Sequence, residues 1–132
     1  DLTDTFLPGD EIVLELPTAP RFTWPDPRID AVRGAVAVER GPLVLCAEST
    51  DLPAGVSLDT LRVNTSSSPI PDGDGAAIEV AVTPLPVAGV MPYVDSVAAP
   101  APTSTHPVRL VPYHRWAERG PSTMRVFVPE LS

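Results

Sequence analysis

Residues 28–48, RIDAVRGAVAVERGPLVLCAE, contain two apolar runs separated by the tight corner Arg40-Gly41-Pro42. In the first run, Val36 and Val38 alternate with small neighbours, a period of two that is typical of a strand with one buried face. Residues 43–47 are almost continuously apolar, which favours a strand covered on both faces. Glycine gives the backbone freedom at the corner, and proline is tolerated at the start of a strand. The stretch therefore predicts two neighbouring strands, the second central in its sheet.

Similar patterns continue outward from this stretch. Alternation of Ile12, Leu14 and Leu16 with Glu11, Val13 and Glu15, after the turn Pro8-Gly9-Asp10, predicts a strand that ends at Pro17. Further strands are expected at 21–24 (a short edge strand), 61–63, 78–82, 108–113 and 124–128, with one short helical turn around 56–61. Loops are expected at 64–75, rich in Ser, Pro, Asp and Gly and therefore mobile, at 91–106, an extended connection, and at 114–123. The predicted fold is all-β: one antiparallel two-sheet sandwich domain over residues 1–132, jelly-roll or immunoglobulin-like, with about eight strands.

Composition excludes several classes of protein. The chain has 132 residues, 18 of them Pro, so almost no window is left for a helix. Its net charge is −8, and its nine basic residues, all Arg, are scattered among seventeen acids, which argues against a nucleic-acid partner. No apolar run is long enough to span a membrane, and the single Cys excludes an internal disulfide.

The beginning of the chain suggests a part of something longer. It starts with DLTDTF, without an initiator Met or a signal-peptide pattern. We therefore expect a domain excised from a longer soluble protein, either cytoplasmic or secreted, and the Lys-free, Arg- and Pro-rich composition suggests a bacterial source.

Polar groups that could form a catalytic or metal site have a simpler interpretation. Asp72 and Asp74 resemble a fragment of a calcium loop but lack its further ligands. His106 and His114 are two ligands where zinc needs three or four, and Cys46 on an apolar strand is better explained as a small buried side chain.

Paired carboxylates are the machinery of glycosidases, and Glu39 and Glu48 flank the corner. With so many acids in the chain, structural ion pairs to Arg33, Arg40 or Arg119 are the favoured interpretation. No catalytic residue, metal ligand or cofactor is predicted for this chain.

Aromatic side chains are the more interesting candidates. Trp24, Tyr113, His114 and Trp116 could stack on sugar rings, fill the core or pack on a neighbouring domain. The order YHRW places Tyr113 and Arg115 on one strand face, and His114 and Trp116 on the other. Both faces cannot be core, so we expect one pair to be exposed and to make a contact, to protein in preference to free sugar.

Three motifs together resemble one family. They are PGD followed by EIVLELPTAPR (8–21), AVRGAVAVERGPLVLCAE (31–48) and LVPYHRWAERGPSTMRVFVP (110–129). They are similar to the C-terminal part of glycoside hydrolase family 127, the β-L-arabinofuranosidase-like family formerly described as a domain of unknown function. The resemblance spans about 9–129 and is loose over 51–107. The chain departs from the family pattern at Leu45, Ala47, His114 and Glu118, where Tyr, Leu, Tyr and Asn are usual; these substitutions keep the strand character.

The resemblance implies a division of labour. Members of the family pair an (α/α)6 helical barrel with β-sandwich domains. The barrel carries the catalytic cysteine, a zinc bound by cysteines and a glutamate, and the sugar pocket, and it uses a retaining displacement. None of these residues can be carried onto this chain, and Cys46 does not correspond to the nucleophile.

The resulting hypothesis is a non-catalytic accessory domain, excised from the C-terminus of a larger enzyme, that supports the barrel or mediates subunit contact, for example in a homodimer. Tyr113, His114, Trp116, Arg119 and Trp24 are the candidate contact residues, and Arg40, Gly41 and Pro42 form a structural corner. The alternative is a stand-alone carbohydrate-binding module, which would present exposed aromatic rings as a flat platform. A plain immunoglobulin-like adhesion domain is disfavoured by the motifs.

Overall fold

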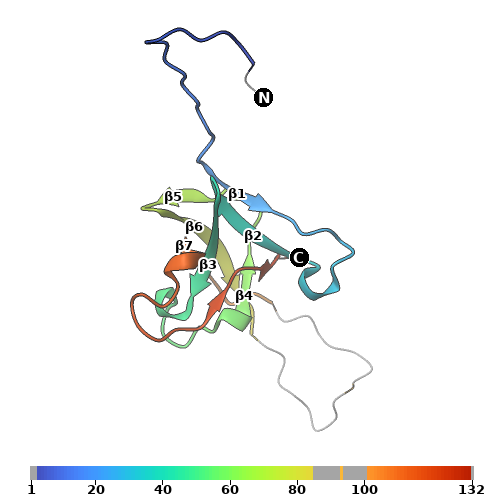
Figure 1. Ribbon diagram of the computed structural model, residues 1–132. Helices are drawn as coiled ribbons and strands as arrows, with labels where there is room; N and C mark the ends of the chain where they lie inside the picture. Colours follow the sequence, from blue (N-terminus) through green and yellow to red (C-terminus); the bar gives the residue numbers. More distant parts are fainter. Residues whose placement is uncertain (1–2, 85–92, 94–100, 132) are drawn as a thin grey trace.

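The computed structural model describes residues 3–84, 93 and 101–131, and in this part of the chain strands are joined by loops and single 3-10 turns (Figure 1). The strands are β1 (Pro20–Thr23), β2 (Ala35–Arg40), β3 (Leu43–Glu48), β4 (Leu61–Val63), β5 (Ile70–Asp72), β6 (Gly75–Val82), β7 (Ser104–Pro112), β8 (Met124–Arg125) and β9 (Val128–Pro129). The 3-10 turns are η1 (Asp30–Val32), η2 (Ser49–Asp51), η3 (Leu58–Thr60) and η4 (Tyr113–Arg115). The prediction of an all-β fold is confirmed, with nine described strands where about eight were expected.

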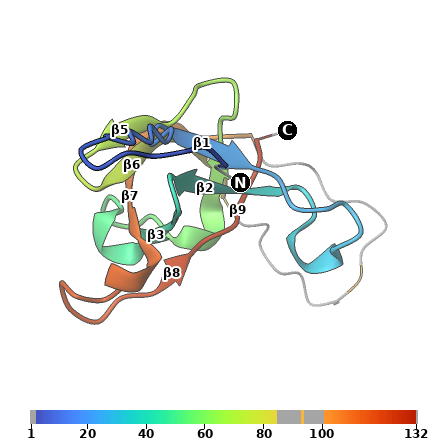
Figure 2. The ribbon, with the colours of Figure 1, turned by 45° about the horizontal axis from the view of Figure 1, so that its top comes forward.

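The strands belong to one curled sheet with the order β1-β2-β3-β7-β6-β4, in which the named strands pair antiparallel. The short strand β9 pairs with β2 and also reaches β4, because Val63 bridges Glu130 and accepts a hydrogen bond from the Leu131 N–H at 2.9 Å. Through β9 the two ends of the sheet approach each other (Figure 2). Its two halves face each other over a common core, which is consistent with the layers of the predicted sandwich.

The core follows the alternation seen in the sequence. Val36 and Val38 of β2 and Leu45 and Ala47 of β3 point inward and are almost completely buried. They pack with buried side chains of η3, β4, β6, β7 and β9: Leu58, Leu61, Val63, Ala76, Ile78, Val80, Val108, Leu110 and Val128. Such burial stabilises a domain by about 1.5–3 kcal/mol for each large aliphatic side chain. As predicted, β3 is central, with β2 and β8 along one edge and β7 along the other.

The predicted strand at 11–16 is wrong for this structure. Residues 3–19 contain no strand, and Ile12, Val13, Leu14 and Leu16 are 57–74% exposed. The segment leaves the sheet from β1 and finds no partner strand among the described residues (Figure 1). A strand needs such a partner for its backbone hydrogen bonds, whatever its side-chain pattern.

The predicted loop at 64–75 is also partly wrong, because it contains β5. Strands β5 and β6 form a hairpin in which Asp72 pairs with Gly75 across the two-residue turn Gly73-Asp74. Gly73 has a φ of +55°, the left-handed conformation that such turns require. A Gly-Asp pair at the two central positions is a recognised hairpin signal that the composition of the segment had masked.

The remaining differences concern the second half of the chain. Most of the connection predicted at 91–106 lies outside the described residues, and β7 begins at Ser104, earlier than the expected 108. The strand predicted at 124–128 is divided into β8 and β9, which pair with different strands. Among the described helical turns, none has the length and apolarity needed to cross a lipid bilayer.

Candidate interdomain contact site

The YHRW segment forms a 3-10 turn at the end of β7 and does not continue the strand. Pairing of β7 with β3 ends where Pro112 meets Leu45, and the chain then turns so that the Trp116 N–H donates to the Tyr113 carbonyl at 3.2 Å. The prediction of two opposite strand faces is therefore wrong. All four residues, 113–116, are exposed, and Tyr113 and Trp116 are 49% and 42% exposed.

The loop that follows η4 is held by one buried carboxylate. Glu48, the last residue of β3, is 1% exposed and accepts hydrogen bonds from the Ala117 N–H at 2.8 Å and the Ser122 hydroxyl at 2.9 Å. It also pairs with the guanidinium of Arg119. A buried carboxylate is costly unless it is paired and hydrogen-bonded, and the loop supplies every one of these partners.

The ionisation of Glu48 reflects this environment. Burial alone would raise the pKa of its carboxyl group, but the hydrogen bonds from Ala117, Arg119 and Ser122 and the positive charge of Arg119 outweigh that effect. The pKa of Glu48 is therefore held below its ordinary value, and the group remains charged at neutral pH.

Arg119 joins two acids at the base of the loop. Its guanidinium donates to both Glu48 and Asp51, with a distance of 2.8 Å from Nη1 to the Asp51 Oδ1. Hydrogen bonds to Asp51 first, and then to Glu48, raise the pKa of Arg119 well above its ordinary value. Bidentate pairing of this kind fixes geometry as well as charge.

A second ion-pair group ties the loop to the β5–β6 hairpin. Arg115 pairs with Asp74 in the hairpin turn and, through Nε at 2.9 Å, with Glu118 in its own loop. Ala117, between them, has a φ of +63°, a conformation that costs a non-glycine residue about 1 kcal/mol. The strained residue is the one whose N–H binds Glu48, so the buried carboxylate holds the loop in this form.

This arrangement presents the exposed rings on a fixed support. Tyr113, His114 and Trp116 lie beside residues whose backbone is anchored to β3, whereas Arg119 has its side chain committed to the anchor itself. Of the predicted contact residues, the structure thus brings Tyr113, His114 and Trp116 together and gives Arg119 an internal role.

Trp24 belongs to a different part of the molecule. It follows β1, its ring meets Phe22 edge to face at 6.0 Å, and its indole N–H donates to Glu130 at 3.0 Å. The end of β1 and the orange turn η4 lie on opposite sides of the molecule in both ribbon views (Figures 1 and 2). The described residues therefore place Trp24 and Trp116 in two separate patches.

The corner Arg40-Gly41-Pro42 forms the turn between β2 and β3. Gly41 has a φ of +56°, and Pro42 is exposed just before the second strand. The Arg40 Nη1 donates to the carbonyls of Gly73 and Gly75 at 2.6 and 2.8 Å, and its Nε donates to the Thr18 carbonyl at 3.3 Å. Arg40 thus ties the corner to the β5–β6 hairpin and to the segment that precedes β1.

The alternative sites have internal partners. Glu39 pairs with Arg21 at 2.6 Å, and Asp72 lies 3.6 Å from Arg109, so each of these acids has an arginine as its partner. Within the described residues, no group of three or more His, Cys, Asp and Glu side chains is arranged to hold a metal ion. Cys46 is buried, and burial, followed by the charges of Glu48 and Asp51, raises the pKa of its thiol to about 11.

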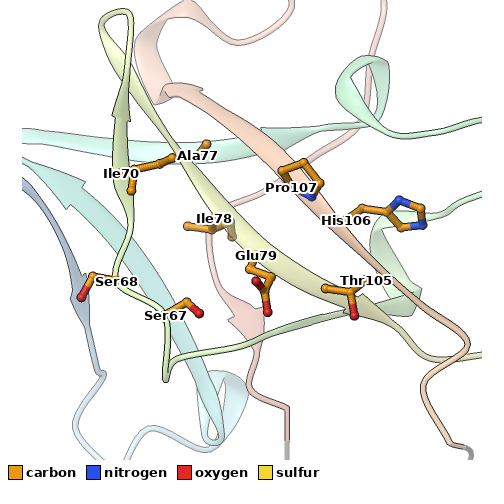
Figure 3. A pocket seen from close by; sticks show the side chains of 9 residues that line it. All are labelled: Ser67, Ser68, Ile70, Ala77, Ile78, Glu79, Thr105, His106 and Pro107. Atoms are coloured by element: carbon orange, nitrogen blue, oxygen red, sulfur yellow. The ribbon is translucent and has the colours of Figure 1, made fainter.

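A hollow of about 440 Å³ lies on the hairpin side of the sheet, beside β5, β6 and β7 (Figure 3). Its acid, Glu79, accepts a hydrogen bond from Asn64 at 2.7 Å, and His106 bonds to Ser104 at 2.9 Å. These two polar side chains have local partners, and the described lining of the hollow contains no Trp, Tyr or Phe ring that could stack on a sugar.

Sequence reasoning named Arg119 among the arginines that could neutralise Glu48, and the structure contains that pair. It assigned Glu39 to the wrong arginines, and it missed the parts played by Asp51, Asp74 and Arg115. Acids at 51 and 74 carry no sequence signal of their own because their partners are more than forty residues away.

Comparison with protein-family models gives a match over residues 20–129 to the glycoside hydrolase family 127 C-terminal domain. A curated relative, the non-reducing end β-L-arabinofuranosidase of Bifidobacterium longum subsp. longum, is 34% identical over 125 residues. That match covers 89% of this chain and 19% of the relative, so the chain spans about a fifth of the relative's length.

Solved structures agree with this comparison. A GH127 β-L-arabinofuranosidase from Geobacillus stearothermophilus T6 matches with 26% identity and a TM-score of 0.64, over 87% of this chain and 19% of that one. A second structure, described as a GH127 β-arabinofuranosidase, matches with 29% identity and a TM-score of 0.60, over 86% and 17% of the two chains. A further glycoside hydrolase, 23% identical with a TM-score of 0.67 over 87% and 20%, shares the fold.

Proposed function

The chain belongs to the family of glycoside hydrolase family 127 C-terminal domains, and from that premise we propose that it is a non-catalytic accessory domain of a larger β-L-arabinofuranosidase-like enzyme. One observation carries this proposal: the family match covers most of this chain, whereas the matched relative is about five times longer than the chain. In this proposal the remaining four fifths of the parent contain the catalytic barrel, and this domain supports it.

Two features of the chemistry favour a non-catalytic role. A nucleophilic cysteine must be accessible and ionised, whereas Cys46 is 1% exposed with a thiol pKa of about 11. A glycosidase also needs two carboxyl groups free to act on the substrate, whereas Glu39 and Glu48 are each neutralised by an arginine.

The loop surface at Tyr113, His114 and Trp116 is the contact that we assign to the barrel. Exposed aromatic side chains on a rigid support resemble the anchors of protein interfaces, since little conformational entropy is lost when they are covered. Ion pairs from Glu48 and Arg119 provide that support.

Substitution of Trp116 by Ala, made both in this chain and in the parent enzyme, tests the proposal. In the isolated chain an exposed residue is replaced, and we expect a change in unfolding free energy within about 0.5 kcal/mol. In the parent the same change removes an interface anchor, and we expect a loss of about 2 kcal/mol or more. Equal, small effects in both would contradict the proposed contact.

A calorimetric titration of the chain with arabinose-containing oligosaccharides distinguishes the accessory role from the alternative, a carbohydrate-binding module. The accessory role predicts no saturable heat. Saturable binding at millimolar affinity or tighter, lost in Trp116→Ala or Trp24→Ala, would instead identify a carbohydrate-binding module. The separation of Trp24 from Trp116 already disfavours a single platform made of both rings.

A further inference from the structure

The segment Glu11–Leu16 has the side-chain pattern of a strand but forms none with the described residues. Three apolar side chains, those of Ile12, Leu14 and Leu16, recur at every second position and are 57%, 74% and 67% exposed. The intervening positions include Glu11 and Glu15. In an extended segment this order gives one apolar face and one mainly acidic face, which suits a strand with one side buried.

The two ends of the segment are already shaped. Before it, the Asp10 N–H donates to the Leu7 carbonyl at 3.0 Å, and the Leu7 N–H donates to the Asp10 carboxylate at 2.8 Å. Pro8 and Gly9, with its φ of +99°, occupy the two central positions of this turn, as type II turns require. The chain is therefore reversed by a closed turn just before the apolar alternation begins.

After the segment, Thr18 is attached to the domain. Its carbonyl accepts a hydrogen bond from Arg40, and its methyl group lies against Gly41, 3.8 Å from where a Cβ would be. The corner that joins β2 and β3 thus fixes the point at which the segment departs from the sheet (Figure 1).

We propose that Glu11–Leu16 is a β-strand that completes the sheet of a neighbouring domain in the same polypeptide, with Arg40 and Gly41 as the anchor between the two. The backbone of the segment pairs with the free edge of a β-sheet in the part of the parent that precedes this chain. The apolar face at Ile12, Leu14 and Leu16 covers the core of that sheet. The existence of this parent rests on the proposed function.

Two observations favour this occupant over a second copy of the chain. The family match starts at Pro20, so the segment lies outside the domain that the family defines. About four fifths of the matched relatives and structures lies outside the match, and the segment directly precedes β1 with only three residues between them. A strand connected this closely reaches an adjacent domain at little entropic cost.

Hydrogen exchange of residues 11–16, measured in the full parent enzyme and in this chain alone, tests the proposal. We expect exchange at least roughly tenfold slower in the parent, because a buried leucine alone contributes more than that factor. Rapid exchange of the segment in the parent would overturn the proposal. Protection in the isolated chain that accompanies a dimer would also overturn it, in favour of a second copy.

A matched pair of variants locates the buried face. Leu14→Thr and Val13→Thr introduce the same β-favouring side chain on opposite faces of the strand. In the parent, Leu14→Thr is expected to accelerate exchange of the segment roughly tenfold, and Val13→Thr by less than about twofold. Equal effects would contradict the assigned face.

These readouts are independent of the contact proposed at Trp116. A protected segment with no effect of Trp116→Ala in the parent would support the strand and contradict the barrel contact. Rapid exchange of the segment in the parent, together with a loss of stability in Trp116→Ala, would contradict the proposed strand and leave the barrel contact in place.

Discussion

Glu48 and Arg119 are 71 residues apart in the sequence and form an ion pair that fixes the loop after Tyr113 and Trp116 to the central strand of the sheet. Glu48 closes the motif that contains the β2–β3 corner, and Arg119 stands in the WAERGPS motif after β7. The two most recognisable stretches of the sequence are therefore the two halves of one structural unit.

Replacing Arg119 by Met should destabilise the domain strongly. The change keeps most of the side-chain volume but leaves a 1% exposed carboxylate without its charged partner, for which about 3 kcal/mol is typical. Arg115→Met is the matched control, because its ion pairs are about half exposed and should cost less than about 1 kcal/mol. Urea unfolding of both variants measures the difference, and equal losses would contradict an anchoring role for Glu48.

The stability of the domain should fall at acid pH through Glu48. The pKa of this group is lower in the folded chain than its ordinary value of 4.5, so its contribution is fully present above that pH. As the pH falls below 4.5 and passes through the folded pKa, the carboxylate is protonated and the contribution is lost. Glu48→Gln should be less stable at pH 7 and lose less stability on acidification. Thermal unfolding between pH 7 and 3 tests this; parallel curves for the two proteins would exclude Glu48 as the source.

The strands could be predicted from the sequence because alternation records which face is buried. Leu45 and Ala47 point into the core and Cys46 away from it, as their order in the chain indicates. The same signal failed at 11–16, where the segment has no partner strand among the described residues. Alternation reports a strand's faces and is silent about which strand pairs with it.

The candidate site was harder to predict, because its geometry depends on contacts between distant residues. Tyr113 and Trp116 could be identified as unusual, but their presentation depends on a 3-10 turn at Pro112 and on a buried acid in another strand. The separation of Trp24 from Trp116 could not be predicted for the same reason, since only the folded sheet places the two rings apart.

Gly75 should not tolerate even a methyl group. A Cβ at this position would lie 1.9 Å from the carbonyl oxygen of Leu110, which belongs to the β7 backbone and cannot move without disturbing the ladder. We expect Gly75→Ala to cost about 3 kcal/mol, the upper part of the usual range for overpacking. Gly55 has a φ of +81° with open space around it, so Gly55→Ala should cost only about 1 kcal/mol. Denaturant midpoints of the two variants compare the cost of steric overlap at Gly75 with the cost of backbone conformation at Gly55. A smaller loss of stability in Gly75→Ala than in Gly55→Ala would contradict the tight β6–β7 contact.

Cys46 should be chemically inert while the domain is folded. Burial and the neighbouring negative charges raise its thiol pKa from 9.0 to about 11, which lowers the thiolate fraction at neutral pH about a hundredfold. Its 1% exposure restricts access of a reagent further. We expect an aromatic disulfide reagent at pH 7.5 to label the folded chain at least about a hundredfold more slowly than the chain in urea. Labelling of the folded chain should be faster in Arg119→Met than in the wild-type chain, because the loop that covers this face of β3 is then released. Rapid labelling of the folded wild-type chain would contradict the buried placement of Cys46 and reopen the question of a reactive thiol in this domain.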